Sequence, residues 1–511
     1  MSSTSSTHAM PTLCHGIDSL FQQRIHHLNQ EDLHKGQYIL YWMTAQRRVE
    51  YNYALEYAVH MANRLHKPLI IFEPLRCDYQ WANDRFHAFL VEGMHNNHAD
   101  TLETNATYIP YVEKQAGTLH SVCATLVEQA SMVVCDMYPC FFLRSLPQKL
   151  ADSLGAQFTT KFVSIDGNGI FPIFATPNEF TTAASFRRFL QKNIIPHLHR
   201  YPLEKPLSYL EHKLDIPCSI KALLPTIEDL SAYPIDHSVP KAQLLGGRHT
   251  AKAKFQHFLQ HNLPQYHLDR NNIEKDPSSG LSPYLHFGHI SSLEIVKNIL
   301  EKYQWTSKQA SPKAHGSREG WWNTAPEVEA FLDQIITWRE LGFVFCHHVQ
   351  NYMDYETLPS WAKITLAEHA KDPRPTIYTL EELEYSQTHD AIWNAAQNQL
   401  RQTGMMHNYL RMLWGKKILE WSPSPQKALE ILIHLNNKYA LDGRDPNSYS
   451  GIFWTLGRFD HAWTERMIFG KIRYMSSDST SKKMDVNAYV QQYTDSVQKF
   501  PKKKSTQLSL F

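Results

Sequence analysis

A chain of 511 residues with 42% hydrophobic and 12% aromatic residues is long enough for two or three domains with large packed cores. Its 51 Lys and Arg side chains balance 50 Asp and Glu side chains, so the formal charge of +1 excludes a global field for polyanions and leaves only local basic patches. The seven cysteines are scattered, odd in number and without a CxxC pair, which indicates a reducing compartment and argues against a structural zinc or iron–sulfur site.

Residues 1–35 are predicted to form a polar lead-in and a first helix. The segment starts Met1-Ser-Ser-Thr and has no apolar stretch of the kind that directs export. No uncharged apolar run in the chain approaches the ~20 residues that a bilayer span needs. We therefore expect a cytoplasmic protein without a membrane segment.

Residues 36–175 alternate between two patterns. Short apolar runs at 38–42, 68–72, 108–112, 132–135 and 162–165 predict strands, and the intervening segments at 52–65, 82–96, 119–129 and 142–154 have helical spacing. This alternation predicts an α/β domain with a doubly wound parallel sheet. Gly167-Asn-Gly169 is too short for a dinucleotide fingerprint, and no GxxxxGK[ST] motif occurs, so a P-loop domain is excluded.

The rest of the chain is predicted to be a connector, a helical domain and a tail. Residues 176–243 are rich in proline, and residues 244–476 have a nearly all-helical pattern. Within the helical domain, residues 304–326 are rich in Ser, Lys and Gly and predict an inserted surface loop. The tail, 477–511, has a lysine-rich stretch at 499–504 and ends Gln507-Leu-Ser-Leu-Phe511.

Three tryptophans lie close together in the helical domain. Trp414 and Trp421 are seven residues apart and share one helix face, and the break at Thr403-Gly404 would let a preceding helix bring Trp393 beside Trp414. A row of indoles leading to a buried polar site suits one-electron transfer to a redox cofactor. Core packing is the more common role of three such tryptophans, so the residues alone do not establish electron transfer and leave both interpretations open.

Two polar segments are candidate binding sites. Ser278-Ser-Gly-Leu-Ser282 precedes a predicted helix, where hydroxyls and free N–H groups make either an anion site for a pyrophosphate or an ordinary N-cap. Leu441-Asp-Gly-Arg-Asp-Pro-Asn447 packs two carboxylates and an amide into a turn. Arg411, one helical turn before Trp414, is a candidate ion-pair partner for one of these carboxylates.

Several collinear segments make the chain similar to one family. Residues 38–55 (Tyr-Ile-Leu-Tyr-Trp-Met to Tyr-Ala-Leu) resemble the first strand and helix of class II cyclobutane-pyrimidine-dimer photolyases, in the photolyase/cryptochrome family. Residues 281–288 resemble their flavin-phosphate motif, residues 388–397, 404–421 and 441–447 their flavin cradle, and residues 469–475 their closing segment. The resemblance spans residues 36–476 and implies an antenna-type α/β domain followed by an all-α FAD-binding domain.

The resemblance implies three groups of site residues. The group expected to hold FAD is Tyr266, Arg270, Ser278, Ser279, Gly280, Leu281, Ser282, Arg411, Asn436, Asp442 and Asp445. In that group Asn436 would face flavin N5, Arg411 and Asp442 would form an ion pair, and Asp445 would lie by the sugar and adenine. The relay is expected to run from Trp414, nearest the flavin, through Trp393 to Trp421 toward the surface. The group expected to contact a flipped-out dimer is Asn271, Gln334, Trp338, Met412 and Trp454, with Trp338 and Trp454 flanking it.

The activity that the resemblance implies is light-driven DNA repair. Photoexcited FADH⁻ would lend an electron to a cyclobutane pyrimidine dimer in double-stranded DNA, the dimer would split, and the electron would return. Aromatic walls suit bases pulled from the stack. The resemblance requires no metal, and it leaves the antenna chromophore open between a deazaflavin, a folate and none.

Gln334 departs from the family pattern, which has glutamate at this position. A carboxylate accepts the imide N–H of thymine, whereas an amide offers both an acceptor and a donor. Because (6-4) photolyases use glutamine at a comparable place, a photolyase for (6-4) lesions stays open as an alternative. A cryptochrome-like photoreceptor, which keeps the flavin and the tryptophans, is the other.

The last five residues suggest a second partner. Gln507-Leu-Ser-Leu-Phe511 resembles the short peptide with which bacterial polymerases and repair proteins dock on the sliding clamp, and Leu and Phe anchors suit a hydrophobic pocket. Such a tail favours DNA repair over signalling and implies a bacterial, nucleoid-associated protein.

Overall fold

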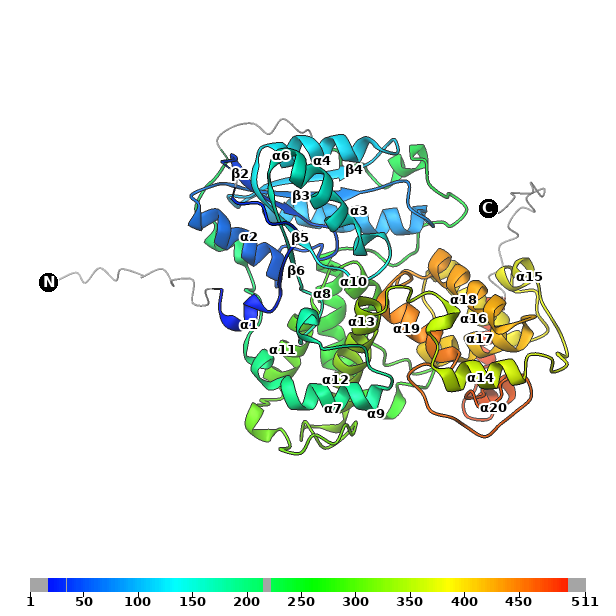
Figure 1. Ribbon diagram of the computed structural model, residues 1–511. Coiled ribbons are helices and arrows are strands. Elements are labelled where there is room, and N and C mark those ends of the chain that lie inside the picture. The colour runs from blue at the N-terminus through cyan, green and yellow to red at the C-terminus, as the bar shows by residue number, and fades with distance from the viewer. Residues whose placement is uncertain (1–16, 34, 215–221, 495–511) are drawn as a thin grey trace.

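The computed structural model describes residues 17–33, 35–214 and 222–494, in a sheet region and a helical region that pack side by side (Figure 1). Within these ranges no helix is long and apolar enough to cross a membrane. The predicted clamp peptide Gln507-Leu-Ser-Leu-Phe511 lies outside the described residues.

The sheet has six strands in the order β1-β6-β5-β2-β3-β4. Their bounds are β1 Ile25–His27, β2 Tyr38–Trp42, β3 Leu69–Leu75, β4 Thr107–Val112, β5 Ala130–Asp136 and β6 Lys161–Ile165. Strands β2 to β6 pair in parallel, which confirms the predicted parallel sheet, and β1 adds an antiparallel edge that was not predicted.

Both faces of the sheet are covered, and this explains the continuous apolar runs. Alternate residues of β2 belong to two different apolar clusters: Ile39 and Tyr41 to one, Leu40 and Trp42 to the other. The helices of this region are α1 Ser19–Gln22, α2 Tyr53–Arg64, α3 Asp84–Thr101, α4 Thr118–Glu128, α5 Leu146–Leu150 and α6 Ala156–Phe158. The side chains of Asn52 and Asn83 cap α2 and α3, so each helix begins where an asparagine follows a strand or turn.

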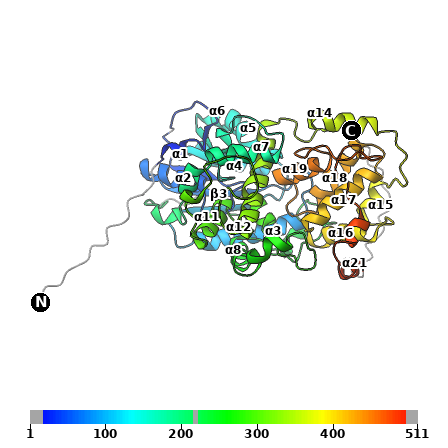
Figure 2. The same ribbon diagram turned by 90° about the horizontal axis from the view of Figure 1, so that it is seen from below.

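In its described residues, 176–214 and 222–243, the proline-rich connector contains one α-helix, α7 Ala183–Asn193, which begins with a capping box between Thr182 and Ser185. The helical region then consists of α8 Arg248–His257, α9 Tyr266–Asp269, α10 Ser282–His286, α11 Ser292–Lys302, α12 Pro326–Leu332, α13 Arg339–His348, α14 Ser360–Glu368, α15 Leu380–Glu384, α16 Ala391–Thr403, α17 Asn408–Trp421, α18 Pro425–Tyr439, α19 Pro446–Thr455, α20 Ser477–Ser481 and α21 Asn487–Thr494 (Figure 2). Helices α20 and α21 extend into the predicted tail, where Asn398 of α16 donates to the carbonyl of Tyr493 (3.0 Å).

The segment 304–326 is only partly the surface loop that its composition predicts. It contains one regular turn, Ser307–Gln309, and an exposed apex. Its three tryptophans, however, are buried: Trp305, Trp321 and Trp322 are at most 9% exposed. The loop is therefore anchored at both ends by indoles packed into the core.

Buried polar contacts join the two regions. Arg85 of α3 donates to the carbonyls of Leu400 and Tyr439 (3.1 and 2.8 Å), and Glu340 of α13 accepts from the backbone N–H of Ile170 (2.6 Å) after β6. Burial raises the pKa of Glu340 to about 7, although the backbone N–H groups of Ile170 and Phe171 favour its charged form. Because such contacts are costly to break, the sheet region holds α13, the helix that carries Glu340, in a fixed position.

Candidate active site

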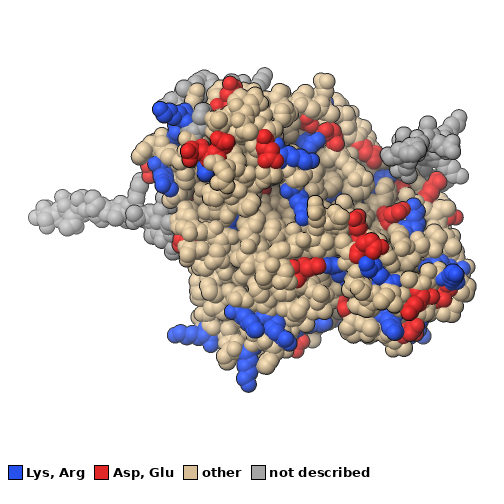
Figure 3. Space-filling model, viewed as in Figure 1, with Lys and Arg blue, Asp and Glu red and all other residues tan. Residues whose placement is uncertain are grey.

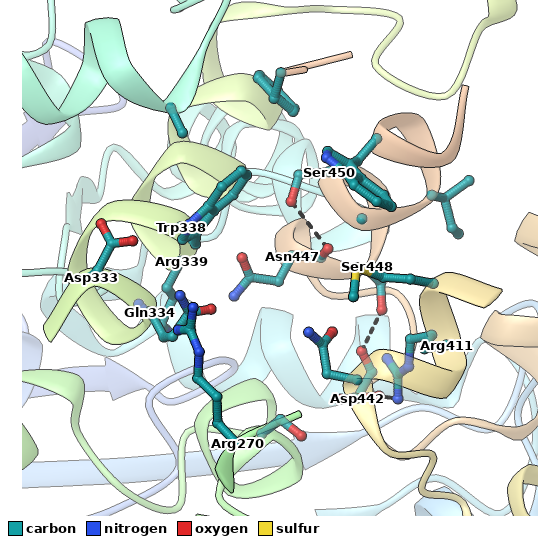
Figure 4. A pocket seen from close by; sticks show the side chains of 18 of the residues that line it. Arg270, Asp333, Gln334, Trp338, Arg339, Arg411, Asp442, Asn447, Ser448 and Ser450 are labelled. Atoms are coloured by element: carbon teal, nitrogen blue, oxygen red, sulfur yellow. Dashed lines mark hydrogen bonds and ion pairs between the residues drawn. The ribbon is translucent and has the colours of Figure 1, made fainter. Parts of the chain in front are cut away.

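A cavity of about 1080 Å³ lies in the helical region (Figure 4). It is lined by every residue predicted to hold FAD or to contact a dimer: Tyr266, Arg270, Asn271, Ser278, Ser279, Gly280, Leu281, Ser282, Gln334, Trp338, Arg411, Met412, Asn436, Asp442, Asp445 and Trp454. Trp414 also lines it, whereas Trp393 and Trp421 lie behind that wall. Residues from seven separate segments thus meet at one place.

One wall of the cavity is a connected polar corner. Arg411 of α17 pairs with Asp442 (3.0 Å between Nη2 and Oδ1), as the resemblance leads us to expect. Ser448 of α19 donates to the carbonyl of Asp442 (2.7 Å), and Asn436 of α18 donates to the hydroxyl of Ser448 (3.1 Å). Figure 4 shows Arg411, Asp442 and Ser448 grouped on one side of the cavity. Fixed donors and acceptors of this kind suit the polar edge of a heteroaromatic ring.

Asp445 is held between the two regions. It caps α19 by accepting from Asn447 N (2.8 Å), and its other oxygen accepts from Tyr138 Oη (2.9 Å) and lies 3.2 Å from His286 Nδ1. Burial would raise the pKa of Asp445, but the hydrogen bond from His286, with Arg339 nearby, outweighs burial and lowers it. Asp445 is therefore a fixed, charged acceptor at the cavity wall.

Gln334 and Trp338 lie on a π-helical turn, Asp333–Trp338, that leads into α13. Single π-turns often occur at functional sites because they redirect side chains relative to a regular helix. Asp333 pairs with Arg187 of α7 (2.7 Å), so its carboxylate is engaged by that guanidinium and does not replace the glutamate that the family pattern has at position 334. Gln334, Trp338, Arg270 and Arg339 all line the cavity, and Figure 4 shows them on the side opposite Arg411 and Asp442.

Lys416 is a buried cation beneath the wall residue Trp454. Its side chain is 0% exposed, its Nζ lies 4.7 Å from the ring centre of Trp454, and it donates to the carbonyl of Thr455 (2.7 Å). Burial lowers the pKa of Lys416 to about 7, partly opposed by Asp460. Sequence reasoning missed this residue, since nothing in its neighbourhood marks it as buried.

The three tryptophans form a continuous row. Trp393 stacks on Trp414 with ring centres 6.4 Å apart and planes at 6°, and it meets Trp421 edge-on at 5.6 Å. Gly404, with φ +73°, ends α16 and lets it turn back along α17. The prediction that Trp421 lies toward the surface is wrong in one respect: its side chain is 2% exposed. Tyr378 and the exposed His389 cover it, each at 5.4 Å.

Several lining residues were not predicted from the sequence. They are contributed by α7, by the apex of the 304–326 segment and by the chain after α19: Thr182, Ala183, Ala184, Arg187, Gly316, Ser317, Arg318, Asp460 and Arg473. The arginine pair in α7, Arg187-Arg188, was the one available signal. Its meaning depends on a tertiary contact that spacing alone does not reveal.

The donor set fits the FAD that the resemblance implies. The cavity exceeds the roughly 300–1,000 Å³ of ordinary ligand pockets, which leaves room for a large cofactor and a second ligand. Hydroxyls of Ser278, Ser279 and Ser282 lie where the first N–H groups of α10 have no partner inside the helix, an arrangement suited to phosphate. Among the described residues, no group of three or more His, Cys, Asp or Glu side chains is arranged to hold a metal ion.

Comparisons with known proteins agree on one family. No family model matches the chain. It is 34% identical to a deoxyribodipyrimidine photo-lyase of Methanothermobacter thermautotrophicus over 473 residues, which cover 92% of this chain and 97% of the relative. It is 32% identical to proteins of the same name from Arabidopsis thaliana (91% and 90% covered) and Potorous tridactylus (91% and 83%). Among solved structures, a bacterial class III photolyase from Agrobacterium tumefaciens superimposes with a TM-score of 0.64 at 16% identity, over 90% of this chain and 87% of that one, which supports the fold.

Proposed function

The chain belongs to the deoxyribodipyrimidine photo-lyases, and from this premise we propose that its cavity binds reduced FAD beside a flipped-out cyclobutane pyrimidine dimer. The protein is a lyase that repairs pyrimidine dimers in DNA with light. The observation that supports this use of the cavity is the convergence of all the expected cofactor and substrate residues on one space.

The residues proposed to hold the cofactor divide by chemistry. The serines at 278, 279 and 282, with Arg270, supply hydroxyls and a cation for the phosphates. The Arg411–Asp442 pair and Asn436 supply a fixed polar edge for the ring. When bound, reduced FAD would supply the electron that light delivers to the dimer. The protein's own part is to bind, orient and exclude water, because no side chain acts as a nucleophile.

The residues proposed to hold the dimer are mostly aromatic or apolar. Trp338 and Trp454 offer ring faces that replace the stacking lost when two bases leave the duplex, and Met412, which also lines the cavity, would pack on the dimer. Gln334 and Asn271 supply amides for the edges of the bases. The buried amino group of Lys416 lies behind Trp454, 4.7 Å from the ring centre, and supports that ring from the side away from the cavity.

The tryptophan row is proposed to return the flavin to its reduced form. Trp414 lines the cavity, Trp393 stacks on it, and Trp421 follows. Tyr378 extends the row of aromatic contacts beyond Trp421. Aromatic rings with centres 5.4–6.4 Å apart, parallel between Trp414 and Trp393 and edge-on beyond, give an electron a path from outer aromatic residues to the cavity.

The tail is proposed to bind a bacterial sliding clamp. The support is the sequence Gln507-Leu-Ser-Leu-Phe511 after a lysine-rich stretch. A synthetic peptide of the last fifteen residues should bind purified clamp, and exchange of Leu510 and Phe511 for alanine should abolish binding. Binding that survives the exchange would refute the docking mode.

A repair assay on defined lesions tests the function. Oligonucleotides with a single cyclobutane dimer or a single (6-4) lesion are incubated with the protein in light and in the dark. We expect light-dependent repair of the cyclobutane dimer. Repair confined to the (6-4) lesion would favour the alternative suggested by Gln334, and flavin binding without repair of either lesion would favour a photoreceptor.

A further inference from the structure

The apex of the 304–326 segment forms part of the cavity wall. Gly316, Ser317 and Arg318 line the cavity together with Gln334 and Trp338. The composition of the segment predicts an inserted surface loop just before Gln334 and Trp338, where it could affect how DNA docks, so its position in the cavity wall calls for a function.

Side chains of α7 hold the apex in this position through backbone contacts. Arg187 donates to the carbonyl of Gly316 (3.0 Å) and Gln191 to the carbonyl of Ser317 (3.0 Å), while Gly316 N donates back to Gln191 (2.7 Å). Arg188 donates to the carbonyl of His315 (3.2 Å). The apex is thus clamped by three side chains of one helix, which positions the next residue, Arg318.

The base of the segment is equally fixed. Trp305 donates its indole N–H to the carbonyl of Trp322 (2.6 Å), and Trp321 meets Trp322 edge-on at 5.0 Å. Ser311 N donates to the carbonyl of Trp321 (2.8 Å). A loop tied at its base and its apex orders its side chains before a ligand arrives, which lowers the entropy cost of binding.

The contact between the apex and α7 also requires glycine at position 316. Gly316 has φ +78°, and a Cβ atom there would lie 2.5 Å from the carbonyl oxygen of Ala184. Both the backbone conformation and the close approach to α7 therefore exclude larger residues.

The charges at the apex favour an anion. Arg318 is exposed, and within the described ranges no carboxylate forms an ion pair with it. Arg187 also lines the cavity; its charge is balanced by Asp333, but its Nη2 is buried without a hydrogen-bond partner among the described residues and can still donate to an acceptor. In Figure 3 Lys and Arg side chains gather along the lower edge, where Figure 1 places α7 and the segment 304–326.

We propose that the 304–326 segment is a DNA-binding loop, in which Arg318 binds a backbone phosphate next to the flipped-out dimer. This rests on the proposed function. Because its formal charge is only +1, the protein needs local cations to bind a duplex. The Arg318 guanidinium lies at the cavity rim, so it would contact the phosphate backbone only where the dimer leaves the base stack. The loop therefore contributes to recognition of damaged DNA more than to general binding.

Equilibrium binding in the dark tests the loop. The probes are a duplex with one cyclobutane dimer and the same duplex undamaged, each titrated at several salt concentrations. Arg318→Ala should weaken binding of the dimer duplex about fivefold or more and reduce its salt slope by about 0.9, the value for one phosphate contact. Binding of the undamaged duplex should change less than about twofold, since it lacks the flipped-out nucleotide. Gly316→Ala, which removes no charge, should produce the same selective loss.

Arg64→Ala is the matched control, because Arg64 is an exposed arginine on α2 outside the cavity lining. This substitution should leave the affinity for both duplexes unchanged. FAD retained per protein separates a DNA phosphate from the cofactor's own phosphates. Three results for the Arg318→Ala protein would overturn the proposal: loss of bound FAD, an equal loss of affinity for both duplexes, or affinities the same as those of Arg64→Ala. Wild-type protein that neither prefers the dimer duplex nor repairs it in light would overturn the proposed function as well.

Discussion

Gln334 is the residue that most affects which lesion the protein repairs. It lies on the π-turn beside Trp338 and lines the cavity with an amide, where the resemblance leads us to expect a carboxyl group. An amide both donates and accepts, so it holds a pyrimidine edge without favouring one protonation state of the base.

Gln334→Glu should raise the yield of cyclobutane-dimer repair per absorbed photon by about threefold or more, which corresponds to ~0.7 kcal/mol in barrier. The reason is that the carboxyl group binds the imide N–H more strongly than an amide does. Gln334→Met, of similar length without hydrogen bonds, serves as control and should lower affinity for the dimer. An unchanged or lower yield in Gln334→Glu would show that the amide is already the better partner here.

Trp414 connects the cavity to the other two tryptophans, because it lines the wall and stacks on Trp393. Trp414→Phe should leave FAD binding intact but slow photoreduction of oxidised FAD about tenfold or more, equivalent to ~1.4 kcal/mol. The rate is followed by flavin absorbance under blue light with an external reductant. Photoreduction at the wild-type rate would count against the relay.

Lys416 should make stability depend on pH in an unusual direction. Its folded pKa is about 7 against 10.5 in the unfolded chain, so between these values the unfolded chain binds the extra proton and stability rises with pH. Lys416→Met removes this pH-dependent contribution to the free energy of unfolding. The difference in unfolding free energy, variant minus wild type, should fall as pH rises from 7 to 10, by at most about 1.4 kcal/mol per unit. Thermal unfolding at several pH values measures it, and a difference independent of pH would show that Lys416 stays charged when folded.

At the scale of elements, α7 determines the shape of the cavity from outside the helical domain. Its Arg187 pairs with Asp333 on the π-turn, and both side chains are less than 10% exposed. The same arginine holds the apex of the 304–326 segment. One helix of the connector thus fixes two walls of the site.

Arg187→Met should destabilise the protein by about 3 kcal/mol or more, since it leaves the Asp333 carboxylate buried without a partner. Thermal unfolding is the measurement. The double variant Arg187→Met/Asp333→Leu should regain most of the loss, because removing both charges leaves none uncompensated. A single variant as stable as wild type would mean that water reaches Asp333.

The sequence predicted the parallel strands well, because each is a continuous apolar run between turns. It did not predict β1, since Ile25–His27 is three residues long and its two histidines give no apolar pattern. The domain boundaries remain a prediction. The connector does more than join two domains, because its helix α7 lines the cavity.

The site was predictable where residues close in sequence carry motifs, as in 278–282 and 441–447. It was not predictable where the contact depends on distant segments. Arg318, Lys416 and Asp460 reach the cavity or its wall only through packing, and no local pattern marks a residue for that role. The buried position of Trp421 was missed for the same reason, because Tyr378 and His389 cover it from another segment.

For the whole molecule, the sheet region and the helical region act as one support for the cavity. Glu340 and Arg85 join them through buried backbone contacts, and Tyr138 of the sheet region reaches Asp445 at the cavity wall. Because the net charge is near zero, local basic surfaces must attract DNA, and we propose that the one around α7 and the 304–326 segment contributes, together with the cavity.

The central claim is that light absorbed by bound reduced FAD drives repair of the dimer in this cavity. The most direct measurement is an action spectrum: dimers repaired per incident photon at a series of wavelengths, on protein with known FAD content. We expect the action spectrum to follow the absorbance of the bound reduced flavin, and we expect no repair in the dark or after FAD is removed. Repair that proceeds in the dark, or persists in protein without flavin, would contradict it.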